Sequence, residues 1–164
     1  MKVISVSFFC LLMFCAFTRA QDTGKSIRNK ETPRKNSLYL EILGNGAVYS
    51  FNYDRLFPIK KPLALVIRVG GNEYHASDTE EKSYNFLGSV GLISGKSRHF
   101  VEGGLGYTYF SDSPDRLTIF SLGYRFQGRK GLLVRATPMY INNSEKGDTF
   151  GNGLWFGTSI GFSF

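Results

Sequence analysis

The stretch Leu154-Trp-Phe-Gly-Thr-Ser-Ile-Gly-Phe-Ser-Phe164 alternates large apolar side chains with small or polar ones. Successive side chains of a β-strand point to opposite faces, so this alternation predicts a strand with one face against hydrocarbon. Thr158 is the one interruption of the apolar face. That face carries Leu154, Phe156, Ile160, Phe162 and Phe164.

Seven similar runs precede this strand, and turn-rich segments separate them. Most of the runs have the roughly nine to eleven residues that a tilted strand needs to cross a bilayer. We therefore expect an all-β chain with eight strands. Their approximate ranges are 37–44, 47–57, 63–74, 83–93, 98–110, 116–126, 131–141 and 154–164.

The connecting segments alternate in length and character. Those at 58–62, 94–97 and 127–130 are short, whereas those at 75–82, 111–115 and 142–153 are longer on average and rich in Asp, Ser, Asn and Gly. Short turns at one end and longer loops at the other are typical of outer-membrane barrels. The first connection, Gly44-Asn45-Gly46, is an exception to this alternation. We expect it to be a tight turn, although it lies at the end where the longer loops are.

The face opposite the apolar one carries three acids and three arginines. A charge buried without a partner costs several kcal/mol, so these groups must face water or pair with one another. An eight-stranded barrel is just wide enough for side chains to fill it. Gly91, Gly106, Gly123 and Gly161 fall on the same face, and we expect them to make room for the arginines. The sequence thus predicts a lumen plugged by ion pairs of Glu41, Asp54, Arg68, Glu102, Arg125 and Arg135, not an open pore.

The amino-terminal part differs from the rest. Residues 1–20 have a basic start, an apolar stretch too short for a membrane-spanning helix, and small residues before Gln21, as a cleaved secretory signal has. Both cysteines, Cys10 and Cys15, lie within it. Residues 21–36 are polar and basic, which predicts a flexible periplasmic arm before a barrel domain at 37–164. A solvated arm is the simplest interpretation; contact with nucleic acid, anionic lipid or peptidoglycan is the alternative.

The residues offer one cluster in which catalysis could be sought. His75 and Ser77 lie beside Glu73, Asp78 and other carboxylates, and could provide a base and a hydroxyl nucleophile for acyl transfer. A polar exposed loop is the simpler interpretation of these residues, and catalysis is the alternative. Two distant histidines, with no cysteine after the signal, give no familiar metal-ligand spacing, so we expect neither a metal nor a cofactor.

The terminal strand resembles the carboxy-terminal signature of bacterial outer-membrane β-barrel proteins, which the barrel-assembly machinery is taken to read. Residues 37–57, SLYLEILGNGAVYSFNYDRLF, are similar to the start of small barrels from Bacteroidota-type bacteria. The resemblance implies a Gram-negative outer membrane, lipid as the surroundings and no substrate. Some such barrels are lipid A deacylases or acyltransferases, but Ser77 is followed by Asp78, where the deacylase pattern has Asn.

We therefore expect a closed, antiparallel, eight-stranded up-and-down barrel in the outer membrane, with its termini in the periplasm and its longer loops outside. Its expected role is structural or surface-interacting, with no nucleic-acid partner. Two alternatives stay open: a lipid A-modifying acyl hydrolase or transferase, and a soluble, exported, lipocalin-like barrel that binds an apolar ligand. The sequence does not identify a surface ligand.

Overall fold

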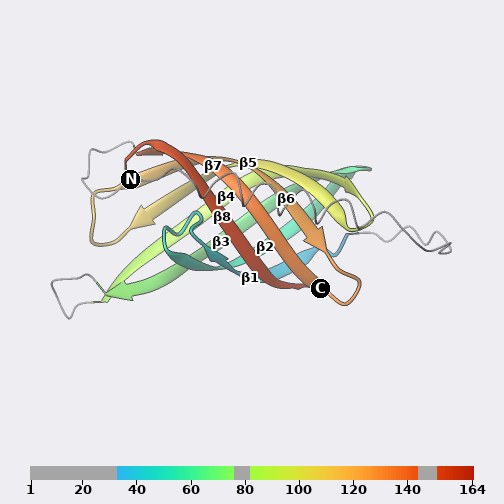
Figure 1. Ribbon diagram of the computed structural model, residues 1–164, viewed down its shortest axis with the longest axis horizontal. Helices are drawn as coiled ribbons and strands as arrows, with labels where there is room; N and C mark the ends of the chain where they lie inside the picture. Colours follow the sequence, from blue (N-terminus) through green and yellow to red (C-terminus); the bar gives the residue numbers. More distant parts are fainter. Residues whose placement is uncertain (1–32, 76–81, 144–150) are drawn as a thin grey trace, which may run out of the picture. The chain divides into compact units, whose positions relative to one another are not determined.

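The computed structural model describes residues 33–75, 82–143 and 151–164, which form a closed antiparallel barrel. Each strand pairs with the next along the chain, and β8 returns to pair with β1 (Figure 1). The predicted fold is confirmed. The strands are β1 (Asn36–Ile42), β2 (Tyr49–Lys60), β3 (Leu63–His75), β4 (Lys82–Lys96), β5 (His99–Phe110), β6 (Arg116–Gln127), β7 (Leu132–Asn143) and β8 (Gly153–Ser163).

The closing register places the terminal strand between β1 and β7. Ile160 lies opposite Leu40 on one side and opposite Val134 on the other. We call the end that holds the β2–β3, β4–β5 and β6–β7 connections the turn end, and the opposite end the loop end. Asn36 and Phe164 meet at the turn end, where each backbone amide donates to the other residue's carbonyl oxygen. Both ends of the barrel domain thus lie on the same side.

The predicted signal at 1–20 and most of the predicted arm lie outside the described residues. The last part of the arm is described, and it contacts the barrel. Arg34 donates from Nη1 to the carbonyl oxygen of Ser163 at 3.1 Å, and from Nη2 to that of Arg129 at 2.7 Å. The carbonyl oxygen of Lys35 accepts a hydrogen bond from the amide of Leu56. Contacts with the barrel therefore begin ahead of the boundary predicted at residue 37.

Large apolar side chains cover the outer wall, in alternation with buried residues along each strand. Phe51, Leu122 and Ile160 are each more than half exposed. Soluble monomers rarely expose contiguous apolar surface on this scale. Among the described residues, no helix is long and apolar enough to cross a membrane.

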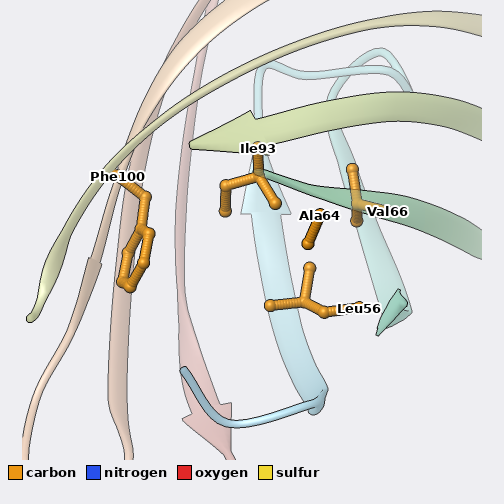
Figure 2. Packing of buried hydrophobic residues seen from close by; sticks show 5 residues of the cluster. All are labelled: Leu56, Ala64, Val66, Ile93 and Phe100. Carbon is orange, nitrogen blue, oxygen red and sulfur yellow. The ribbon is translucent and has the colours of Figure 1, made fainter. Parts of the chain in front are cut away.

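The inner wall is more varied than the sequence predicts. Leu56, Ala64, Val66, Ile93 and Phe100 form an apolar cluster near the turn end (Figure 2). A second cluster lies near the loop end, and the charged residues lie between the two along the strands. The prediction of a polar interior is therefore incomplete, because it followed the charges and glycines and overlooked the apolar residues on the same face. The second cluster contains Phe110, Leu117, Ile119, Met139 and Ile141.

Candidate functional site

Six strands bring their charged residues into one layer of the lumen. Each of these residues occupies an inward position of the alternating pattern, and none is more than 5% exposed. The layer contains as many arginines as acids, so its formal charge is zero. Its members are Glu41 on β1, Asp54 on β2, Arg68 on β3, Glu102 on β5, Arg125 on β6 and Arg135 on β7.

Glu102 is the centre of this layer, since all three arginines approach its carboxylate. Arg125 donates from Nε to Oε2 at 2.8 Å, and Arg135 donates from Nε to Oε1 at 2.6 Å. The Nη2 atom of Arg68 lies 3.6 Å from Oε1. One carboxylate on β5 therefore ties together β3, β6 and β7.

Arg125 also reaches the opposite wall. Its Nη1 donates to Oδ1 of Asp54 at 3.2 Å, and its Nη2 donates to Oδ2 at 2.5 Å. Two parallel bonds from a guanidinium to a carboxylate form the strongest and most directional type of side-chain ion pair. Because β2 and β6 are four strands apart in a ring of eight, this pair spans the lumen.

Glu41 completes the layer towards the loop end. Its Oε1 lies 3.5 Å from Nη1 of Arg68 and 3.7 Å from Nη1 of Arg135. The ring of Tyr39 lies close to the same two guanidinium groups, with its centroid 5.6 Å from Cζ of Arg68 and 5.0 Å from Cζ of Arg135. Both cations thus have an aromatic face and a carboxylate as neighbours, an arrangement that favours their burial.

The connection between β1 and β2 does more than reverse the chain. Predicted as a tight turn at 44–46, it runs from Leu43 to Val48, and we call it the plug loop. Leu43 and Ala47 adopt positive φ angles of 53° and 66°. These angles turn the loop inward, so that Asn45 is only 2% exposed. The predicted tight turn is therefore corrected to an inward-folded loop.

Several walls of the barrel hold the plug loop. The amide of Asn45 donates to Oε2 of Glu41 at 3.1 Å. Its carbonyl oxygen accepts from Oγ1 of Thr108, on β5, at 2.7 Å, and the carbonyl oxygen of Gly46 accepts from Nδ2 of Asn85, on β4, at 3.0 Å. Ala47 packs on the loop-end apolar cluster. The plug loop therefore crosses the lumen on the loop-end side of the charged layer.

The inward glycines serve a different purpose from the predicted one. A Cβ added at Gly161 would lie 2.3 Å from Cβ of Tyr39, and one at Gly106 would lie 3.0 Å from Nδ2 of Asn45. For Gly91 and Gly123 the nearest atoms belong to neighbouring strands. None of these nearest atoms belongs to an arginine. The glycines make room for the tyrosine, the plug loop and close strand packing.

The predicted catalytic cluster is only partly described. His75 is the last residue of β3, paired through its backbone with Lys82, and Ser77, Asp78, Glu80 and Glu81 lie outside the described residues. Glu73 forms an ion pair with Lys82 at 2.8 Å, and the hydrogen bond to this carboxylate raises the pKa of Lys82. No cluster of three or more potential metal ligands occurs in the described part of the chain.

The terminal residues proposed to guide assembly all point outward. Leu154 is 87% exposed, and the other four are 45–58% exposed. His99, the first residue of β5, has its Nδ1 atom 2.5 Å from the hydroxyl of Tyr124 on the outer wall. The role of the terminal strand in assembly stays a prediction.

These features match a known architecture. The structure of the Yersinia pestis outer membrane protein Ail, determined in a phospholipid bilayer nanodisc, aligns with a TM-score of 0.50 and 12% identity over 80% of this chain and 99% of that one. The chain has the fold of a small outer-membrane-type barrel. The β domain of the Bordetella autotransporter BrkA aligns with a TM-score of 0.39 and 20% identity over 71% of this chain and 52% of that one. No protein-family model matches the sequence, and no curated protein matches it.

Proposed function

We propose that this chain is a non-conducting barrel of the Gram-negative outer membrane, with a structural or surface-interacting role. One observation carries the proposal: the apolar side chains cover the outside of the barrel, and a charge-balanced ionic layer fills its middle. A bilayer satisfies the first arrangement, and mutual pairing satisfies the second. The similarity of fold to Ail supports the same location.

The contents of the lumen support the non-conducting part of the proposal. The turn-end cluster, the ionic layer and the plug loop follow one another along the barrel axis. Arg125 and Asp54 bridge opposite walls, so an ion would have to break this pair to pass. A lipocalin-like barrel would need an apolar cavity at this position, and the described interior gives that alternative no support.

Membrane integration is tested with the full chain. We expect the protein to require detergent for extraction, and the folded and boiled forms to migrate differently on a gel, as compact barrels do. In planar bilayers the inserted protein should give no stable conductance steps. Quantitative extraction without detergent would refute the location, and reproducible conductance would refute the closed lumen.

Topology is tested by inserting protease sites in intact cells. With the termini in the periplasm, a site next to Lys146 in the β7–β8 loop should be cleaved from outside, whereas a site next to Gln127 in the β6–β7 turn should be protected. The matched pair controls for expression and folding. The reverse pattern would overturn the orientation.

The enzymatic alternative keeps its own test. If the chain acylates or deacylates lipid A, replacing His75 or Ser77 by alanine should abolish turnover. Activity that persists in both variants would reject those residues. No described contact favours this alternative, and the assignment to Bacteroidota-type bacteria stays a prediction.

A further inference from the structure

Outside the lumen, every charged side chain described at the turn end is positive. Each of its three connections contributes two basic residues, at 60–61, 96 with 98, and 129–130. Arg34 and Lys35 precede β1 at the same end, and Arg55 lies opposite Asn36 on β2. We call the exposed members of this group the cationic rim. They are Lys35, Arg55, Lys60, Lys61, Lys96, Arg129 and Lys130.

The described acids all lie elsewhere. Three are inside the lumen, where arginines neutralise them, and Glu73, Asp112 and Asp115 lie at the loop end. The loop end also carries basic residues, Lys82 and Arg116, so its charges are mixed. The described turn end is therefore uniformly positive, whereas the described loop end carries both signs. A field of one sign attracts partners of the opposite sign.

The rim lies next to the apolar outer wall. The guanidinium of Arg55 lies 5.5 Å from the ring centroid of Phe57, and Ile59, beside Lys60 and Lys61, is 60% exposed. Phe126 and Tyr124 contact the ring of His99 at the same end. Aromatic rings at the edge of an apolar belt are typical of the headgroup level of a bilayer. Long basic side chains at that level extend towards phosphate groups.

We propose that the cationic rim binds the phosphates of anionic phospholipids in the inner leaflet of the membrane that holds the barrel. This inference rests on the proposed membrane location and orientation. Exposed apolar residues among the cations favour a lipid over a soluble polyanion, because a polyanion in water gains nothing from Ile59 or Phe57. Each basic residue near an anionic bilayer surface strengthens association by about fivefold at moderate salt, and screening weakens the effect at high salt.

The test uses the full chain reconstituted in phosphatidylcholine nanodiscs that contain a minority of phosphatidylglycerol. Spin-labelled versions of the two lipids report their relative association with the barrel. The wild type should prefer phosphatidylglycerol several-fold, and the preference should fall as salt is raised. The rim variant Lys60→Gln, Lys61→Gln, Lys96→Gln, Lys130→Gln should lose most of this preference.

Two matched variants isolate charge from structure. Replacing the same four lysines by arginine should retain the preference, since the charge is retained. Lys82→Gln, at the loop end, should leave it unchanged. A wild type without lipid preference, or a rim variant with the wild-type preference, would overturn the inference.

Two further readouts separate the competing explanations. Inorganic polyphosphate is titrated against the detergent-solubilised chain; if it bound more tightly than phosphatidylglycerol and displaced the lipid, the rim would be a polyanion site and the inference would fail. Heat-modifiable migration is recorded on every sample. An inserted barrel without lipid preference would contradict this inference alone, whereas a chain that stays soluble without detergent would contradict the proposed function as well.

Discussion

The middle of the lumen and its turn end are filled by different chemistry, although three strands, β2, β3 and β5, supply residues to both. On β2, Leu56 packs in the apolar cluster and Asp54, one inward position along, binds Arg125. On β5, Phe100 and Glu102 show the same change. Apolar packing tolerates small changes of shape, because every contact is weak and non-directional. The ionic layer requires every partner, because an unpaired charge in the lumen would have no water to solvate it.

The two regions therefore contribute differently to the fold. Ion pairs in a protein interior often stabilise no more than apolar residues of the same volume would, but losing one partner is costly. A strand register that separated the members of the ionic layer would leave charges unpaired in the lumen, and it would therefore be unfavourable. The apolar clusters contribute to the fold by burying apolar side chains.

The largest effect is expected when the ionic layer loses its centre. Glu102→Gln would leave three arginines facing two acids, and it should lower the free energy of unfolding by about 3–5 kcal/mol. Unfolding by urea in lipid vesicles, followed through the fluorescence of Trp155, measures this change. A loss below about 1 kcal/mol would mean that water reaches the layer and that the middle does not differ from an exposed surface.

The next effect concerns the turn-end cluster. Ile93→Ala should destabilise the barrel by about 3 kcal/mol, because it removes buried apolar volume from a packed group. Leu92→Ala is the matched control, since Leu92 is the outward neighbour and is 47% exposed. The same urea titration should show the smaller loss for the control. An equal loss at both positions would remove the distinction between inner and outer wall.

A smaller effect is expected at the loop end of the lumen. Thr108→Val removes the hydroxyl that donates to the carbonyl oxygen of Asn45, at a cost of about 1 kcal/mol. Amide hydrogen exchange at residues 43–48 should accelerate, since the plug loop loses one of its anchors. Thr118→Val, on the adjoining strand, serves as the control. Unchanged exchange would show that the loop holds its place without β5.

The smallest effect should come from the ion pair outside the lumen. The Glu73 and Lys82 side chains are 40% and 58% exposed, so Glu73→Gln should change stability by less than about 1 kcal/mol. High salt should reduce even that difference. A cost comparable to that of Glu102→Gln would show that pairing strength does not depend on burial here.

The strands and their two faces could be predicted because a period of two is a local property. Leu105 and Glu102 fall on opposite faces wherever the strand lies in the barrel. The plug loop could not be predicted in the same way, since its inward course depends on positive φ at two non-glycine residues, Leu43 and Ala47, and on hydrogen bonds from Asn85 and Thr108 across the barrel. The neighbours of Gly161 likewise depend on the pairing of β8 with β1, which alternation does not specify.

The ionic layer draws on strands from the first to the seventh, and this has a consequence for biogenesis. A sheet that has entered the bilayer with only β5, β6 and β7 formed would contain Glu102, Arg125 and Arg135 without Asp54 or Glu41, and so would carry excess positive charge in hydrocarbon. Stepwise insertion, strand by strand, would therefore pass through costly intermediates. For a barrel of this kind, we expect the sheet to curl before or during its entry into the membrane, so that its first and last strands meet early.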